Sequence, residues 1–75
     1  MAMQITVRTQ SADPPLQLSV NSDEDIQMIK ERIQFAKGTP PEHQRLLFQG
    51  NHLDIGYTIG SYGIQNGSVI FLVVS

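Results

Sequence analysis

The chain has 75 residues, with five Lys and Arg against seven Asp and Glu, a formal net charge of −2 and no cysteine. This length supports one small domain with one core, which leaves little room for a closed active site, so we expect a binding module and not an enzyme. The nearly balanced charge does not favour nucleic acid, and without cysteine there is no disulfide, thiolate zinc site or cysteine nucleophile.

Two N-terminal strands are expected from hydrophobic periodicity. Residues 3–8 alternate apolar and polar side chains with a period of two, and residues 16–20 repeat this alternation. Asp13-Pro14-Pro15 interrupts the pattern because proline has no amide hydrogen to donate to a ladder. The two strands therefore predict a hairpin, with a loop at residues 10–15 that is long for such a connection.

A helix is predicted over residues 25–37. The preceding run, residues 21–25, has the sequence NSDED, which is rich in residues that cap helices and suit the positive end of the helix dipole. Ile26, Ile29 and Ile33 recur at helical spacing and form one apolar stripe. Gly38 is placed to end the helix in a left-handed conformation.

The C-terminal half predicts three further strands. Residues 45–48 form the first, residues 49–51 a turn, and Leu53 begins a short second strand. Residues 68–74 form the last strand. The glycines of the intervening turns are expected to need unusual backbone dihedrals: Gly56, Gly60, Gly63 and Gly67.

Four segments also resemble ubiquitin-like proteins in order and spacing. They are MQITV at residues 3–7, residues 26–33 with Lys30, GTPPEHQRLLFQG at residues 38–50 and SYGIQ at residues 61–65. One extra residue in the first hairpin loop aligns residues 3–74 with the family as a single domain. The resemblance implies an α+β fold, the ubiquitin-like β-grasp, in which a mixed sheet of four to five strands packs on one helix.

One helix can cover only one face of such a sheet. The inward residues are expected to pack with the helix isoleucines, and they are Met3, Ile5, Val7, Leu16, Leu18, Val20, Leu46, Ile70 and Leu72. The outward residues of the first two strands are polar, as a solvated face requires: Gln4, Thr6, Arg8, Gln17 and Ser19.

The last strand departs from this pattern and predicts a protein-binding patch. Val69, Phe71 and Val73 point outward with Leu47, and the expected rim is Arg8, Arg45, Gln49 and Asn51. The alternative is that β-branched residues merely suit a pleated backbone. The resemblance matches Leu47, Phe71 and Val73 to ubiquitin's recognition patch, whereas its loop leucine is replaced by Gln10 or Ser11.

The family's conjugating tail is not found here. Ubiquitin ends in paired arginines and a diglycine, whereas this chain stops at Ser75, and Asn51 and Asn66 occupy the lysine positions most used for ubiquitin chains. We therefore expect a non-conjugated docking module of the ubiquilin-like shuttle type, excised from a larger protein. The alternative is a modifier truncated before its diglycine tail.

The resemblance implies partners in the ubiquitin–proteasome pathway, namely proteins with ubiquitin-interacting helices or receptors for ubiquitin-like domains. We expect a monomer in the cytoplasm and/or nucleus, with no membrane partner, because no apolar run is long enough to span a bilayer.

No cofactor or metal site is expected. His43 and His52 fit no standard zinc spacing, and the carboxylates before the helix are explained as caps. Phe35 and Ile55 stand at positions that are charged in the ubiquitin pattern. They are either covered by local packing or part of a second contact surface, toward a host domain or a like copy.

Overall fold

The structure is a computed structural model that describes residues 2–9 and 13–75. Its sheet contains five strands: β1 (Ala2–Thr9), β2 (Leu16–Asn21), β3 (Gln44–Phe48), β4 (Asn51–His52) and β5 (Val69–Val74). The spatial order is β2-β1-β5-β3-β4, in which β1 and β5 are parallel and the other neighbouring pairs are antiparallel.

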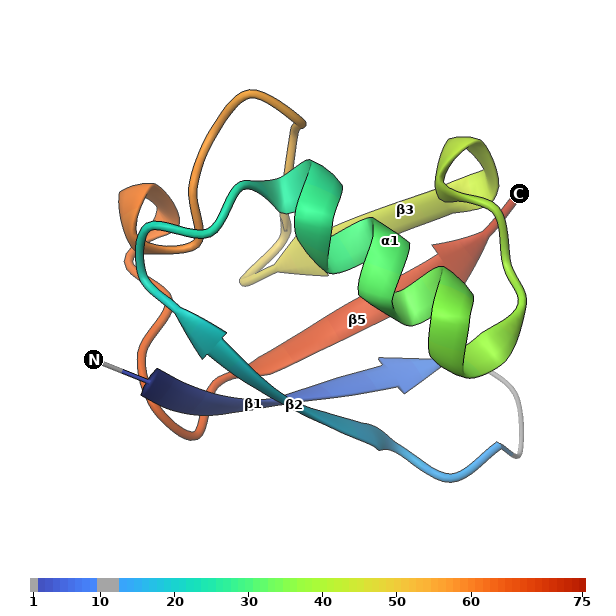
Figure 1. The fold of residues 1–75 in the computed structure, drawn as a ribbon, viewed down its shortest axis with the longest axis horizontal. Helices are drawn as coiled ribbons and strands as arrows, with labels where there is room; N and C mark the ends of the chain where they lie inside the picture. Colours follow the sequence, from blue (N-terminus) through green and yellow to red (C-terminus); the bar gives the residue numbers. More distant parts are fainter. Residues whose placement is uncertain (1, 10–12) are drawn as a thin grey trace.

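One helix, α1 (Ile26–Lys37), lies across one face of this sheet (Figure 1). Two short 3-10 turns, η1 (Pro41–His43) and η2 (Gly60–Tyr62), lie in the connections. This arrangement is the ubiquitin β-grasp, so the expected α+β architecture, a mixed sheet packed on one helix, is confirmed.

Both ends of α1 are capped by the residues that the sequence indicates. Asp25 is the N-cap, and its Oδ1 accepts a hydrogen bond from the Gln27 amide at 2.8 Å. Gly38 has a left-handed conformation with φ 80°, and its amide donates to the Gln34 carbonyl at 2.7 Å. The helix thus begins one residue later than predicted, because Asp25 satisfies the first turn from outside it.

The core lies between α1 and the sheet. All three helix isoleucines and most of the predicted strand residues are buried, whereas Met3 and Leu16 are partly buried against the core. Side chains from β3 and the C-terminal connections complete the core, although the predicted inward set omitted them: Phe48, Leu53, Ile59 and Ile64.

Two details of the connections differ from expectation. The short strand is Asn51–His52, and Leu53 follows it with its side chain buried, so it does not begin a strand. Gly60 does not have a positive φ, unlike Gly56, Gly63 and Gly67. A Cβ at Gly60 would lie 2.9 Å from the Ser22 carbonyl oxygen, so close approach and not an unusual dihedral excludes larger residues there.

A buried glutamine ties α1 to β3. Gln44 is 3% exposed, and its Nε2 donates to the carbonyl oxygens of Lys30 at 2.8 Å and Thr39 at 2.9 Å. These bonds fix the start of β3 relative to the helix.

Candidate protein-binding surface

The face of the sheet turned away from α1 carries the apolar side chains of β5. Along this strand Ile70 and Leu72 are buried, whereas Phe71 is 50% exposed and Val69 is 38% exposed. Val73 is half-buried on the same face, as is Leu47 of β3. We call these four side chains the sheet-face patch: Leu47, Val69, Phe71 and Val73.

The strand register places Phe71 at the centre of this patch. Phe71 pairs with Arg8 of β1 on one side and with Leu47 of β3 on the other, and Leu47 pairs in turn with His52 of β4. In the neighbouring row, Val73 pairs with Arg45. Side chains opposite one another in a sheet are close enough to interact, so an aromatic ring and aliphatic groups adjoin two cations.

Arg8 and Arg45 are both exposed, and they give the rim a positive character. Gln49 and Asn51, the other two residues of the predicted rim, are also exposed in the β3–β4 hairpin, but Asn51 pairs with the buried Phe48 and not with a residue of the patch. Gln10 and Ser11, which stand where ubiquitin has its loop leucine, lie outside the described residues. Sequence reasoning did not include His52, which the register places beside Leu47. The sequence feature that could have indicated His52 is the very short strand after the Gln49–Gly50 turn.

The hairpin turn that positions Gln49 has an uncommon backbone. Gln49 has φ 52° and Gly50 has φ 81°, and these two residues connect the paired residues Phe48 and Asn51. Positive φ at both central residues is the signature of a type I′ turn, whose twist matches that of the strands. Glutamine is an unfavourable residue for this conformation, so the turn carries strain at the rim of the patch.

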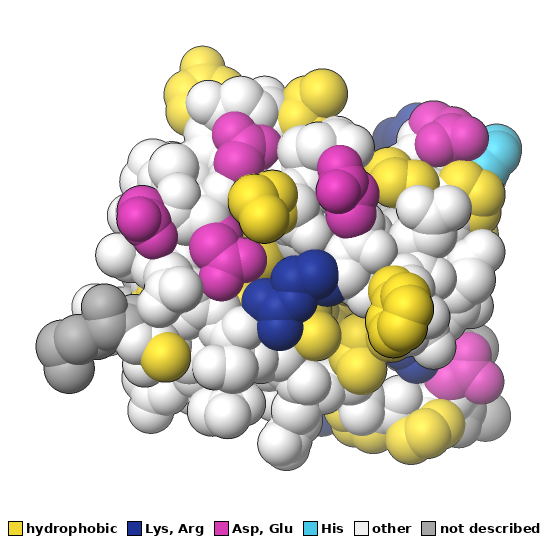
Figure 2. Space-filling model, viewed as in Figure 1, with side chains coloured by type: hydrophobic (Ala, Val, Ile, Leu, Met, Phe, Trp, Pro, Cys, Tyr) yellow, Lys and Arg dark blue, Asp and Glu magenta, His cyan; other side chains and the backbone are white. Residues whose placement is uncertain are grey.

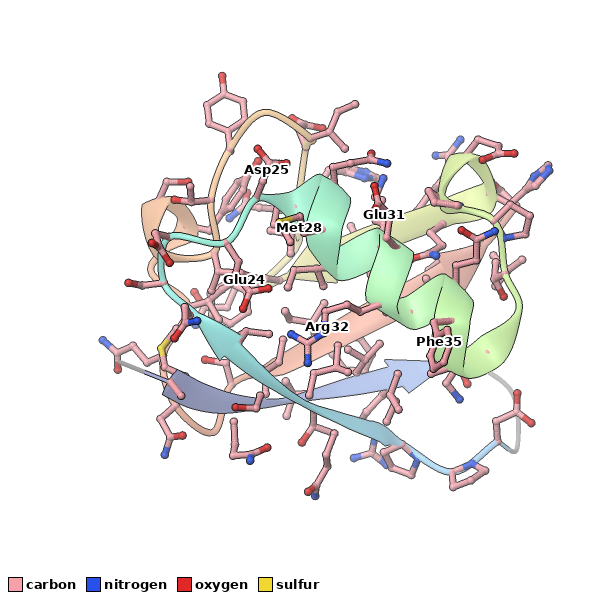
Figure 3. All side chains as sticks on the ribbon, viewed as in Figure 1. Glu24, Asp25, Met28, Glu31, Arg32 and Phe35 are labelled. Carbon is pink, nitrogen blue, oxygen red and sulfur yellow. The ribbon has the colours of Figure 1, made fainter. Side chains whose placement is uncertain are left out.

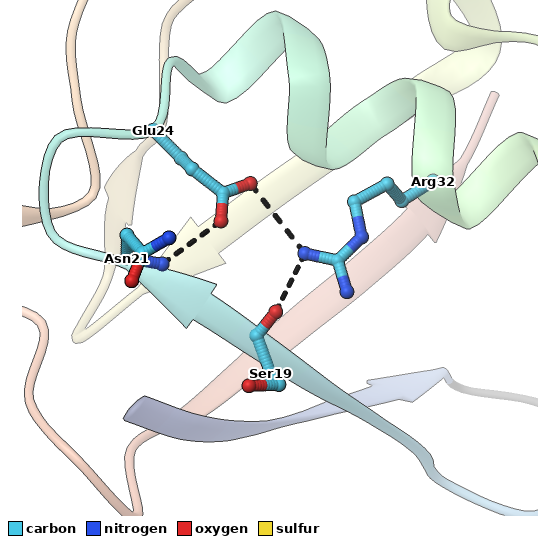
Figure 4. Close-up of polar contacts among 4 residues, drawn as sticks. All are labelled: Ser19, Asn21, Glu24 and Arg32. Carbon is cyan, nitrogen blue, oxygen red and sulfur yellow. Dashed lines mark hydrogen bonds and ion pairs between the residues drawn. The ribbon is translucent and has the colours of Figure 1, made fainter. Parts of the chain in front are cut away.

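The acidic residues before α1 are engaged in local structure. Glu24 Oε1 accepts from the Asn21 amide at 2.9 Å, and its Oε2 lies 3.4 Å from Arg32 Nη1 (Figure 4). Asp25 caps the helix. Within residues 2–9 and 13–75, no three His, Cys, Asp or Glu side chains gather in a group that could hold a metal ion.

The two apolar residues at charged positions of the ubiquitin pattern are exposed and not covered by local packing. Phe35 is 94% exposed and Ile55 is also exposed. They line different grooves: Ile55 adjoins Lys30 and Pro41, whereas Phe35 adjoins Leu18 of β2. Sequence reasoning missed a third exposed apolar residue of the helix side, Met28. Met28 lies seven residues before Phe35, a spacing that puts both side chains on one face of the helix and could have indicated it.

None of the helices in the described part of the chain has the length and apolar character needed to cross a membrane.

Comparison with known proteins identifies the family. The model of the ubiquitin family matches residues 5–75. NEDD8-like protein RUB3 of Arabidopsis thaliana is 34% identical over 73 residues, which cover 97% of this chain and 92% of that protein. Ubiquitin-like protein NEDD8 of Dictyostelium discoideum is 35% identical over 60 residues, covering 80% of this chain and 78% of that protein.

A longer relative also matches. Ubiquitin domain-containing protein DSK2 of Saccharomyces cerevisiae is 32% identical over 73 residues, which are 97% of this chain but only 20% of that protein. The matches to the family model and to relatives of similar length agree with the topology. The chain therefore belongs to the ubiquitin family.

Proposed function

We propose that this chain is a non-catalytic ubiquitin-like protein that partner proteins recognise through the sheet-face patch. The observation that carries the proposal is the cross-strand row Arg8–Phe71–Leu47. It places a half-exposed aromatic side chain next to an exposed arginine, two residue types enriched at protein interfaces, and beside an aliphatic side chain.

The chemistry of the rim indicates the kind of partner. Arg8 and Arg45 flank Phe71 and Val73, so carboxylates of a partner would meet a positive edge while its apolar side chains cover the patch. An amphipathic helix with an apolar stripe and acidic flanks fits this surface, as in a ubiquitin-interacting motif.

Between the two classes of ubiquitin-like protein, the relatives favour the modifier. The proteins whose length this chain nearly matches are named NEDD8-like or NEDD8. This supports the alternative given above, a modifier truncated before its diglycine tail. The docking module stays as the second candidate, supported by the match to DSK2, in which the similar segment is a small part of a long chain.

The residues that follow Ser75 in the gene product separate these two classes. A modifier requires a diglycine whose carboxylate an activating enzyme can adenylate and join to a thiol. Incubation of the gene product with a NEDD8-type activating enzyme and ATP should then yield a thioester that a reducing agent cleaves. A long continuation that forms no thioester would favour the docking module.

Binding through the sheet-face patch is tested by mapping. A uniformly ¹⁵N-labelled sample titrated with a helical peptide from a ubiquitin-interacting motif should show amide shifts in β1, β3 and β5. We expect the largest shifts at residues 45–49 and 69–73. Shifts centred on Gln17 and Ser19 of β2 would mean that another surface binds the peptide.

A further inference from the structure

The outer face of α1 exposes two large apolar side chains. Met28 is 53% exposed and Phe35 is 94% exposed. They are seven residues apart, so both point to the same side of the helix, roughly 10 Å apart along its axis. Figure 3 shows both side chains on the face of α1 that is turned away from the sheet. Neither contributes to the buried core.

A shallow groove runs beside these two side chains. It has a volume of about 370 Å³ and is lined by Leu18, Met28, Glu31, Arg32, Phe35 and Ala36. We call it the helix-face groove. Leu18 comes from β2, so the groove lies between the helix and the outer strand of the sheet. Figure 2 shows hydrophobic side chains open to solvent on this face, beside acidic groups.

The charges around the groove are distributed unevenly. Glu24, Asp25 and Glu31 lie around Met28, at the N-terminal end of α1 (Figure 3). Asp25 and Glu31 accept hydrogen bonds from uncharged donors: Asp25 Oδ1 accepts from the Gln27 amide at 2.8 Å and the Gly56 amide at 3.4 Å, and Glu31 Oε2 accepts from Gln27 Nε2 at 3.2 Å. Their negative charges are therefore not neutralised by these contacts.

The cations of α1 offset only part of this negative charge, because Arg32, which lines the groove, pairs with Glu24. Arg32 Nη1 donates to the Ser19 carbonyl oxygen at 2.6 Å and lies 3.4 Å from Glu24 Oε2 (Figure 4). Lys30 lines a different groove with Pro41, and Lys37 Nζ donates to the Pro14 carbonyl oxygen at 3.4 Å. The end of the groove at Met28 is thus acidic, whereas the end at Phe35 is apolar.

We propose that the helix-face groove is a docking site for an amphipathic helix of a partner protein, with basic residues at one end. The apolar side chains of the partner helix pack on Phe35, Ala36 and Leu18, and the lysines or arginines of that helix lie opposite Asp25 and Glu31. Charge complementarity selects this occupant over an acidic or neutral helix. The site is separate from the sheet-face patch and does not depend on the proposed function.

The test uses two synthetic helical peptides of about 18 residues. Both carry leucines at spacings of three and four, and one has lysines at one end where the other has glutamates. Titrated into the ¹⁵N-labelled chain, the lysine peptide should shift the amides around Met28, Glu31 and Phe35. At these amides the glutamate peptide should bind at least tenfold more weakly, and any shifts that it causes should centre on the sheet-face patch.

Variants localise the contact. Phe35→Ser removes the exposed aromatic side chain and should weaken the binding of the lysine peptide by about 30-fold. A loss of this size is typical when an aromatic residue is removed from an interface. Glu31→Gln should weaken it several-fold at low salt and less at 0.5 M NaCl. Phe71→Ala, on the opposite face, should leave this binding unchanged, and a melting curve for each variant checks that it is folded.

Four results would overturn the proposal. Equal affinity of the two peptides at the amides around Met28, Glu31 and Phe35 would show that charge does not select the occupant. Unchanged affinity in folded Phe35→Ser, or shifts centred on Phe71 and Leu47, would place the contact elsewhere. Shifts at Met28 and Phe35 that depend on protein concentration without peptide would assign the groove to a second copy of this chain.

Discussion

The two faces of this small fold share one core but differ in charge. The open face of the sheet carries Phe71 and Leu47 beside Arg8 and Arg45, whereas the outer face of α1 carries Met28 and Phe35 near acidic side chains. A molecule with a positive rim on one side and a negative rim on the other can discriminate between partners of opposite charge. Each face can then be altered without disturbing the other.

The largest expected effect is the difference in stability loss between a core residue and a sheet-face residue of the same strand, β3. Leu46 is buried and its neighbour Leu47 is half-buried on the opposite face. Leu46→Ala should lower the free energy of unfolding by about 2–5 kcal/mol because it leaves a cavity against α1. Leu47→Ala should cost about 1 kcal/mol or less. Urea denaturation of both variants measures the difference, and equal losses would contradict the assigned faces.

The charge of the rim gives the next effect. Arg45 is paired with Val73 at the edge of the sheet-face patch. Arg45→Glu should weaken the binding of an acidic-flanked helix by about tenfold at low salt, mainly through slower association. Stopped-flow binding at several salt concentrations measures this. Glu31→Gln, on the helix side, is the matched control and should change nothing. An association rate that is unaffected by Arg45→Glu would show that the rim does not guide this partner.

A smaller loss of stability is expected from the contacts that join Arg32 of α1 to β2 and to the residues before the helix. Arg32→Ala removes the contacts to Ser19 and Glu24. Because this arginine is partly exposed, the loss of stability should be only about 0.5–1 kcal/mol and should shrink as salt is added. Thermal melts at low and high ionic strength measure it. A loss that is independent of salt would indicate that packing of the side-chain stem dominates.

The smallest effect concerns the hairpin at the edge of the sheet face. Gln49 has φ 52°, which asparagine tolerates better than glutamine does. Gln49→Asn should raise the free energy of unfolding by about 0.5 kcal/mol, or the melting temperature by roughly 2–4 °C. Gln17→Asn, in β2, has an extended backbone and should not stabilise the protein. A lower melting temperature for Gln49→Asn would mean that the glutamine makes a compensating contact.

The regular elements could be predicted because their periodicity is strong. Alternation located β1 and β2, a continuous apolar run located β5, the isoleucine spacing located α1, and Gly38 marked its end. The mixed sheet was expected only from the resemblance, since alternation alone does not say which strands are neighbours. Phe48, Leu53, Ile59 and Ile64 were missing from the predicted core because most of them lie in turns, where neither period applies.

The candidate sites were predictable to different extents. An apolar outward face on β5 is visible in the sequence, because Val69, Phe71 and Val73 alternate with residues that must be buried. The helix-face groove is not visible in this way. Its lining includes Leu18, which belongs to the core pattern, and Asp25, near its acidic end, is explained by the sequence as a helix cap. Only the packing of α1 against β2 brings these residues together.

Binding of partners to the sheet face through Phe71 can be tested in one titration. The labelled chain and its Phe71→Glu variant are titrated with a ubiquitin-interacting helix, with Gln17→Ala on β2 as the control and a melting curve for each. Phe71→Glu should stay folded, change stability by about 1 kcal/mol or less, and lose roughly 2 kcal/mol or more of binding free energy, whereas Gln17→Ala should bind as before. Unchanged affinity in folded Phe71→Glu would contradict the account.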